Sequence, residues 1–292
     1  MSWIELKLNL PLEKAEDISA YLFAQGCEGL NLTDDGISIY FSDHRWRDEI
    51  KLSIAAYIKE FVPGFALKDI QVVAVADSDW NKNWKEYFKP FYPAAGILIK
   101  PPWEDCHERQ GDIVLTINPQ MAFGTGHHES TQLVIHGLQK YMKSGMRVLD
   151  AGTGSGILAI LADKLGAESV IGFDDDPVAL KNAVENATLN NSSQNVQFVL
   201  ARPEDMQQSE YDLVLANINR NILLRYAEIF QEFLAENGKL ILAGVIRKDE
   251  IVMMDRFEKL GYRLVEKNTM KDWLSLVLEL KAKVSEPTYS NY

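Results

Sequence analysis

The sequence predicts an α/β protein in which a parallel sheet covered by helices follows a smaller α+β domain. Its 292 residues are about twice the typical domain length of roughly 150, which favours two domains. From about residue 96, short β-rich runs alternate with helical or turn-containing segments, and these runs cover residues 148–150, 169–174, 196–200, 213–216 and 240–243. Such alternation is typical of parallel sheets.

The first 76 residues have a different order of elements. Their apolar periodicity predicts strand, helix, two strands, helix and strand, at residues 3–10, 12–24, 29–32, 37–41, 50–61 and 70–75. Asp34-Asp35-Gly36 separates the two central strands and predicts a hairpin, because turns with positive φ favour Asp-Gly. The βαββαβ order is that of the ferredoxin-like fold, so we expect residues 1–76 to form an N-terminal α+β domain.

Residues 77–95 are expected to form a linker helix, because six aromatic residues lie in this polar stretch: Trp80, Trp84, Tyr87, Phe88, Phe91 and Tyr92. Their aromatic face either packs on the following domain or lines a substrate groove, and packing is favoured. The following domain is expected to span residues 96–281. Its last β-rich runs, 262–267 and 273–280, predict an antiparallel pair at the end of the sheet. The tail, residues 282–292, is expected to be frayed.

Composition argues against several classes of protein. The formal net charge of −12 disfavours a protein that chiefly binds nucleic-acid backbone, and it favours basic partners or simply reflects solubility. No apolar run approaches the roughly 20 residues of a membrane span, and the start lacks the organisation of a signal peptide. Two cysteines are too few for a disulfide framework. We therefore expect a monomeric protein of the reducing cytoplasm.

A glycine-rich segment gives the first indication of a ligand. Asp150 to Gly156 follows a β-rich run and precedes an apolar helix at 157–165, where a sharp turn lets the backbone approach a ligand closely. A dinucleotide fold would have Gly-x-Gly-x-x-Gly, whereas Gly152, Gly154 and Gly156 form Asp-x-Gly-x-Gly-x-Gly. This pattern resembles the first motif of class I methyltransferases, which bind S-adenosylmethionine. A glycine turn without a ligand is the alternative.

Two further polar residues close predicted strands. Asp174 lies 22 residues after Gly152, near the separation of about 20 expected for a carboxylate that binds ribose hydroxyls. Asp174 is therefore the candidate for the ribose contact. Asp175 and Asp176 follow it, so one of the three could instead lie in a solvated turn or cap the helix before Pro177. Asn217 ends the run 213–216 and offers donors and an acceptor near a reacting centre, or else caps a helix.

The segment 118–131 contains Gly124 and Gly126 and then a polar helix start. On its residues alone, it indicates a lid or a cofactor loop. His127 and His128 could suggest a metal site. We expect none, because adjacent histidines point in different directions and no Cys or Glu cluster completes a coordination shell.

Taken together, these segments resemble the ribosomal protein L11 methyltransferases. That family has an Ala-Phe-Gly-Thr-Gly loop followed by His and Thr, then the glycine motif, an acidic strand end and Ala-Asn-Ile. The chain has them in the same order, at 122–126 with His128 and Thr131, at 150–159, at Asp174 and at 216–218. The resemblance covers most of the chain. It implies a Rossmann-like class I methyltransferase sheet with helices on both faces.

The resemblance also implies functional residues. Thr131, Gly152, Asp174 and Asn217 would contact S-adenosylmethionine, and the N-terminal domain would recognise the ribosomal protein. The chain departs from the family at Asn118-Pro119-Gln120 (Asp-Pro-Gly in the family), at 127–129 (Thr-His-Pro) and at Thr153 (Cys). These departures leave the cofactor positions intact and put the positioning of the substrate near the loop in doubt.

The implied reaction is methyl transfer to lysine ε-amino or chain α-amino groups of ribosomal protein L11. We expect Asn217 to orient the amine, while Phe123 and Thr125 shield the site. One alternative is a methyltransferase that acts on nucleic acid or a small molecule; base-methylating enzymes, however, usually continue with Pro-Pro and an aromatic, where this chain has Ile218-Asn219-Arg220. Another is a binding module without catalytic activity, which the intact glycines and Asp174 disfavour.

Overall fold

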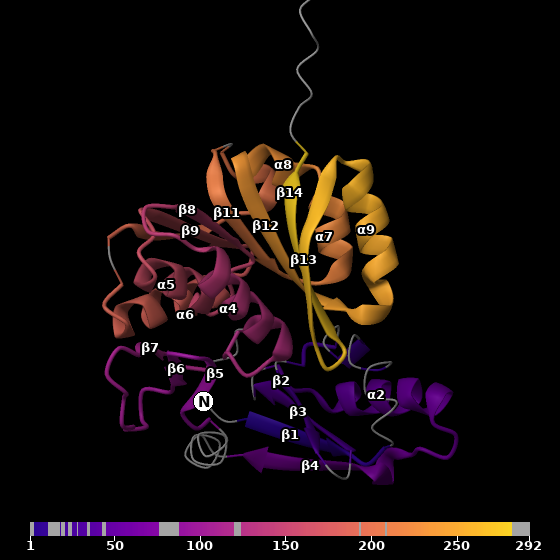
Figure 1. Cartoon of the computed structure of the whole chain (residues 1–292). Helices are drawn as coiled ribbons and strands as arrows, with labels where there is room; N and C mark the ends of the chain where they lie inside the picture. Colours follow the sequence, from indigo (N-terminus) through magenta and orange to yellow (C-terminus); the bar gives the residue numbers. More distant parts are fainter. Residues whose placement is uncertain are drawn as a thin grey trace, which may run out of the picture. The chain divides into compact units, whose positions relative to one another are not determined.

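The computed structural model describes residues 3–10, 18, 21–22, 25–27, 29–33, 36–42, 45–75, 88–119, 124–192, 194–207 and 209–281. The chain divides into two compact units, Met1–Phe88 and Lys89–Tyr292, and each is described by itself (Figure 1). The division falls inside the segment 77–95 in which a linker is expected.

The first unit contains a four-stranded antiparallel sheet in the order β2-β3-β1-β4. Its strands are β1 (Trp3–Leu8), β2 (Gly29–Thr33), β3 (Gly36–Ser42) and β4 (Ile70–Val75). Helix α2 (Asp48–Phe61) and the 3₁₀ helix η2 (Leu67–Asp69) lie between β3 and β4, and residues 18, 21 and 22 are helical. This order and pairing are those of the ferredoxin-like arrangement that the sequence predicts.

The hairpin between β2 and β3 depends on Gly36, which pairs with Thr33. Gly36 has φ +144°, and a Cβ atom at this position would lie 2.1 Å from the Leu8 carbonyl oxygen of β1. Only glycine fits such a close approach of two backbones. The Asp-Gly signal therefore predicted the turn correctly, although Asp34 and Asp35 lie outside the described residues.

The second unit is built on a seven-stranded sheet in the order β10-β9-β8-β11-β12-β14-β13. The strands are β8 (Arg147–Ala151), β9 (Ser169–Asp174), β10 (Val196–Leu200), β11 (Tyr211–Asn217), β12 (Leu234–Ile246), β13 (Tyr262–Met270) and β14 (Trp273–Leu280). Strands β8 to β12 pair in parallel, whereas β14 is antiparallel to both β12 and β13. The predicted parallel sheet with an antiparallel end is thereby confirmed.

Helices cover both faces of this sheet because successive strand residues point to opposite sides. Leu213 and Leu215 of β11 join one buried cluster with apolar residues of α4 (Glu129–Tyr141) and α5 (Ile157–Lys164). Val214 and Ala216 join a second cluster on the other face. That cluster includes residues of α7 (Arg220–Tyr226), α8 (Ile229–Phe233) and α9 (Glu250–Lys259), which Figure 1 shows on the opposite side of the sheet from α4 and α5. Among its described residues, this unit also contains the helices α6 (Pro177–Leu189), η4 (Pro203–Asp205) and η5 (Arg247–Asp249).

A small three-stranded sheet of β5 (Phe91–Ala94), β6 (Ile97–Lys100) and β7 (Ile113–Thr116) corrects the last part of the helix expected over 77–95. Residues 76–87 lie outside the described part, but Phe91–Ala94 is a strand that pairs antiparallel with β6. Gly96, with φ +74°, makes the turn between them. Aromatic residues are as typical of strands as of packed helices, so their density could not decide between the two.

The register of the large sheet brings three strand ends together. Ala151 at the end of β8 pairs with Phe173, next to Asp174, and with Ala216, next to Asn217. The polar residues that close β9 and β11 therefore flank the glycine turn after β8 at the carboxyl edge of the sheet. Ligands of open α/β sheets bind at this edge. In the part of the chain that the structure describes, no helix is long and apolar enough to cross a membrane.

Candidate functional site

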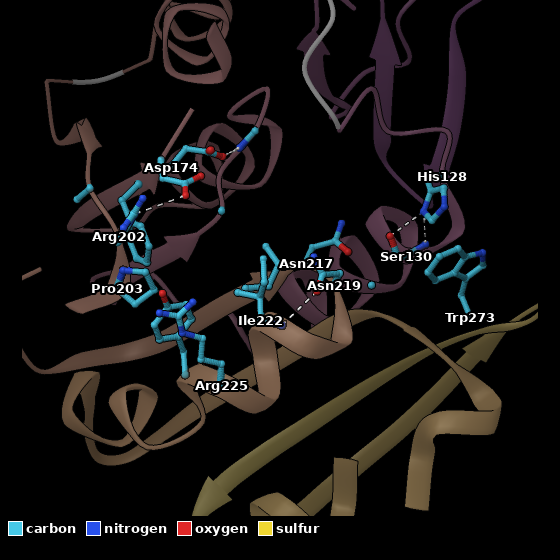
Figure 2. Close-up of a pocket in the computed structure, with 18 residues that line it drawn as sticks. His128, Ser130, Asp174, Arg202, Pro203, Asn217, Asn219, Ile222, Arg225 and Trp273 are labelled. Atoms are coloured by element: carbon cyan, nitrogen blue, oxygen red, sulfur yellow. Dashed lines mark hydrogen bonds and ion pairs between the residues drawn. The ribbon is translucent and has the colours of Figure 1, made fainter. Parts of the chain in front are cut away.

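A cavity of about 580 Å³ opens at this carboxyl edge, within the range of roughly 300 to 1,000 Å³ typical of ligand pockets. Figure 2 shows Asp174, Arg202 and Pro203 at one end of the cavity. His128, Ser130 and Trp273 lie at the other end. Asn217, Asn219 and Ile222 lie between these two groups. An elongated cavity of this kind can hold a cofactor along one part and an acceptor group at the other.

The glycine turn after β8 forms one wall of the cavity through Gly152 and Gly154. The N–H groups of Gly152 and Thr153 both donate to the Phe173 carbonyl oxygen at 2.9 Å, which ties the turn to β9. Gly152 has φ +71°, and a Cβ atom there would lie 2.3 Å from Ile218 Cγ2. Ile218 also lines the cavity, so a side chain at position 152 would push Ile218 into the space that a ligand could occupy. Glycine leaves this space free.

The third glycine of the motif has a packing role in this structure. Gly156, with φ +80°, is the N-cap of α5 and does not line the cavity. A Cβ atom there would lie 3.0 Å from Ala183 Cβ on α6 and 3.1 Å from the Phe198 ring on β10. Gly156 therefore lets the start of α5 pack closely against its neighbours, as the last glycine does in related nucleotide-binding turns.

Replacing Gly152 with alanine is expected to weaken S-adenosylmethionine binding at least about tenfold, because the added methyl group displaces Ile218 into the cavity. Gly145→Ala is the matched control: Gly145 has φ +85°, but its Cβ would meet nothing within 4 Å. Both variants carry left-handed backbone strain of about 1–2 kcal/mol, so both should unfold at lower temperature. Calorimetric titration separates them, and equal affinities in the two variants would contradict the role of Gly152.

The three consecutive aspartates have distinct environments. Asp174 lines the cavity, and its Oδ2 accepts a hydrogen bond from Gly154 N at 2.9 Å while its Oδ1 accepts one from Asp176 N at 3.0 Å. Asp176 is the N-cap of α6, with Oδ1 accepting from Val178 N at 2.8 Å. Asp175 also borders the cavity, but its side chain is exposed, has no hydrogen bond to the glycine turn and lies 3.9 Å from Arg202. Of the three, Asp174 thus has the position expected of the ribose partner.

Asp174 retains lone pairs for a ligand, because a carboxylate can accept about four hydrogen bonds and the backbone uses two of them. Burial raises the pKa of this carboxyl, and the hydrogen bonds from Gly154 and Asp176 act in the opposite direction. The Asp174 side chain is therefore held in one orientation at the cavity wall by the turn that it faces.

Asn217, at the end of β11, is 8% exposed and lines the cavity. Its Nδ2 donates to Thr131 Oγ1 at 3.1 Å, whereas its Oδ1 has no hydrogen-bond partner among the described residues. A buried, unpaired carbonyl oxygen is costly, so this atom indicates a position where a ligand donor would be accommodated. The alternative role as a helix cap belongs to Asn219, whose Oδ1 accepts from Ile222 N at 3.1 Å.

The other predicted residues are placed differently. Thr131 is fully buried in the first turn of α4 and reaches the cavity only through Asn217. Thr125 is described but does not line the cavity, and Phe123 lies outside the described residues. The structure thus brings together Gly152, Gly154, Asp174 and Asn217, with Thr131 behind them.

An aromatic wall that the sequence does not predict lies at the end of the cavity opposite Asp174. The ring of His128 lies 4.4 Å from that of Trp273 at an interplanar angle of 69°. His128 is the N-cap of α4, where its side chain accepts from Ser130 N, and burial lowers the pKa of its imidazole. An ion pair between Lys271 and Glu129 links the turn before Trp273 to α4. Trp273 is 122 residues beyond β8, and no local pattern connects it with the site.

The two adjacent histidines contact different rings, as expected. His127 packs on Phe91, with ring centroids 4.0 Å apart, whereas His128 faces Trp273. Among the described residues, no group of three or more His, Cys, Asp or Glu side chains could hold a metal ion.

Asp150, the acidic residue that opens the glycine motif, is fully buried beneath the turn. Burial raises its pKa from 3.8 to about 7, and the Thr153 hydroxyl, which donates to Oδ2 at 2.7 Å, opposes this shift. The folded protein therefore binds an additional proton between about pH 4 and 7, where the unfolded chain has released it. The contribution of Asp150 to stability is highest at low pH and falls as pH rises through 7.

We expect Asp150→Asn to remove this pH dependence. Between pH 5 and 8 the unmodified protein should lose about 2 to 3 kcal/mol of unfolding free energy relative to the variant, since each pKa unit corresponds to about 1.4 kcal/mol. Chemical denaturation at both pH values measures the difference. Asp175→Asn, at an exposed position, should follow the unmodified protein; a parallel profile for Asp150→Asn would show that this carboxyl has no raised pKa.

The protein-family model described as "Ribosomal protein L11 methyltransferase (PrmA)" matches residues 2–281. The ribosomal protein L11 methyltransferase of Clostridium perfringens (strain SM101 / Type A) is 32% identical over 314 residues, covering 96% of this chain and 99% of that protein. The one from Alkaliphilus oremlandii (strain OhILAs) is 32% identical over 312 residues, with 96% and 99% covered.

A solved structure gives the same relationship at the level of the fold. The crystal structure of the ribosomal protein L11 methylase from Lactobacillus delbrueckii subsp. bulgaricus has a TM-score of 0.63 and 30% sequence identity, and the match covers 66% of this chain and all of that one. The strand order, the glycine turn and these matches agree, and the chain belongs to the ribosomal protein L11 methyltransferase family, with the fold of class I S-adenosylmethionine-dependent methyltransferases.

Proposed function

We propose that this protein transfers methyl groups from S-adenosylmethionine to amino groups of ribosomal protein L11, at lysine ε-amino groups, the chain α-amino group or both. The observation that carries the proposal is the arrangement of the cavity. Asp174 lies toward one end, where Gly154 of the glycine turn donates to it, and Asn217, with its buried, unpaired Oδ1, lies between Asp174 and an aromatic wall. Family membership supports the substrate.

The residues present fit S-adenosylmethionine. Asp174 has acceptor capacity left for two ribose hydroxyls, and Gly152 and Gly154 let the backbone approach the cofactor without side chains in between. When bound, S-adenosylmethionine supplies a methyl group on a sulfonium, which is a strong electrophile. The protein therefore needs to position the cofactor, not to activate it. Thr131 supports this arrangement indirectly, by holding the Asn217 amide.

The acceptor must be a neutral amine. A lysine with a pKa of about 10.4 costs roughly 4 to 5 kcal/mol to deprotonate at pH 7. Asn217 Oδ1 can accept a hydrogen bond from the amine and direct its lone pair toward the methyl group. Burial lowers the pKa of His128, so its ring and Trp273 form a wall without a fixed positive charge that desolvates the amine. Proximity then contributes the remaining acceleration.

The roles expected for Phe123 and Thr125 as shields of the site, and for residues 1–76 as the recognition domain for ribosomal protein L11, remain part of the proposal. A ribosomal substrate agrees with a cytoplasmic location. Methylation of nucleic acid is the second candidate activity, and the net charge of −12 disfavours it.

Incubation with labelled S-adenosylmethionine and purified ribosomal proteins, followed by mass mapping, tests the proposal. Label on amino groups of ribosomal protein L11 is the expected result. Label on another protein or on ribosomal RNA would overturn the substrate, and a failure to bind the cofactor in calorimetric titration would overturn the enzymatic function as a whole.

A further inference from the structure

Helix α6 and its C-cap carry three buried asparagines at intervals of four residues, Asn182 and Asn186 in the helix and Asn190 at the cap, which are 0%, 0% and 5% exposed. Residues four apart lie on the same face of a helix. Asparagine is not favoured inside helices, and a buried amide is costly unless it is hydrogen-bonded. The partners of these three side chains therefore indicate their purpose.

Asn190 acts as a substitute for a neighbouring strand at the edge of β7. Its Oδ1 accepts from Thr116 N at 2.8 Å, and its Nδ2 donates to Thr116 O at 2.7 Å. One side-chain amide thus pairs with both backbone groups of one strand residue, as the backbone of an adjacent strand would. These bonds secure the last residue of β7 and do not involve the glycine turn.

Asn186 uses the same two atoms to join two different segments. Its Oδ1 accepts from Asn118 N at 2.8 Å, and its Nδ2 donates to Ser155 O at 2.9 Å. Asn182 Nδ2 donates to Asn118 O at 3.2 Å. Ser155 lies between Gly154 and Gly156, so Asn186 connects the glycine turn to the chain that leads toward the Ala-Phe-Gly-Thr-Gly loop.

Ser155 makes a second connection to that loop. Its side chain is 1% exposed, and its Oγ donates to Gly124 O at 2.5 Å. A Cβ atom on Gly124, which has φ +102°, would lie 2.9 Å from Ser155 Oγ, so glycine permits this close approach. Asn118 and Gly124 are thereby both tied to Ser155, the first through Asn186 and the second directly.

We propose that Asn186 is a positioning residue for cofactor binding, which fixes the Ser155 peptide and thereby the cavity-lining backbone of the glycine turn against Asn118. The inference rests on the proposed binding of S-adenosylmethionine. Gly152 and Gly154 line the cavity wall, and the same turn continues into the Ser155–Gly156 peptide, whose carbonyl Asn186 holds. Ser155 extends the same restraint to Gly124.

The row of three asparagines itself provides a matched control. Asn190, the C-cap of the same helix, is also buried, and its amide likewise accepts from a backbone N–H and donates to a backbone carbonyl, but both groups belong to Thr116; its Nδ2 also donates to Asn186 O at 2.8 Å. The test compares Asn186→Asp with Asn190→Asp. Each substitution keeps the acceptor for a backbone N–H and replaces the donor with an oxygen that faces a carbonyl. Calorimetric titration with S-adenosylmethionine gives the Kd, and thermal unfolding gives Tm.

Both variants should lower Tm by similar amounts, whereas only Asn186→Asp should raise the Kd, by about tenfold, with Asn190→Asp within about twofold of the unmodified protein. Ser155→Ala, which removes little volume, should raise the Kd severalfold and serves if Asn186→Asp does not fold. Equal Kd values for the Asn186 and Asn190 variants would overturn the positioning role of Asn186 and leave the proposed function standing. An unchanged Kd in Ser155→Ala, where that variant is needed, would do the same. Absence of binding by the unmodified protein overturns the proposed function together with it.

Discussion

Asn217→Ala is expected to lower the turnover number for methyl transfer by about 100-fold or more, with a much smaller effect on cofactor affinity. Asn217 lines the cavity, its buried carbonyl oxygen has no hydrogen-bond partner among the described residues, and its Nδ2 donates to Thr131 Oγ1 at 3.1 Å. Without this acceptor the amine loses its orientation, and misplacement of a reacting group by about 1 Å costs on the order of 100-fold.

Steady-state kinetics with purified ribosomal protein L11 measure this loss, and calorimetry measures the Kd for S-adenosylmethionine. Thr131→Val should cause a smaller loss of about tenfold, because it leaves Oδ1 present but releases the amide that carries it. The matched control is Asn221→Ala, four residues along the chain, where the side chain bonds Arg220 instead of lining the cavity. An unchanged turnover number in Asn217→Ala would exclude the orienting role.

Asp174→Asn is expected to weaken S-adenosylmethionine binding by about 100-fold. Hydrogen bonds to a charged group contribute about 1.5–3 kcal/mol each, and the substitution removes the charge and turns one acceptor into a donor. Whichever oxygen becomes the amide nitrogen, the new donor faces the N–H of Asp176 or of Gly154, so the substitution also breaks one existing bond. The shape of the side chain is kept, which separates this effect from a change in packing.

Asp175→Asn is the control for Asp174, since it is the next residue and also borders the cavity, but is exposed and only 3.9 Å from the exposed Arg202. Exposed ion pairs contribute about 0–1 kcal/mol, so the Kd should change by no more than about fivefold. Calorimetric titration of both variants at one salt concentration gives the comparison. Similar losses in the two variants would mean that net charge at this edge, and not the ribose contact, governs affinity.

Local patterns were sufficient for the elements that depend on local geometry. The strand, glycine turn and helix around Gly152 are adjacent in sequence, and their backbone angles depend on the glycines themselves. The same holds for the β2–β3 hairpin, where Gly36 meets the β1 backbone. The order of elements then predicted both folds, because parallel strands need crossovers and a βαββαβ order has one common arrangement.

Strands β5 to β7 and the contacts of the row of three asparagines could not be predicted in this way. Four-residue strands carry too little periodicity, and Phe91 is assigned to a strand only by its pairing with Ile99. Asn186 appears in the sequence as an ordinary polar residue of a helix. Its partners lie 68 and 31 residues away, at Asn118 and Ser155, and a contact over such separations exists only after the chain has folded.

The amino-acid sequence by itself therefore determined the fold class, the edge of the sheet that carries the site and the residues that close its strands. The tertiary structure decided which side chains reach the cavity. It placed Asp174 in the wall and Asp176 in a cap, put Thr131 behind Asn217, and brought Trp273 to His128. The physical reason is that strand and helix positions follow from local periodicity, whereas the direction of a side chain and its partner depend on register and packing across the whole sheet.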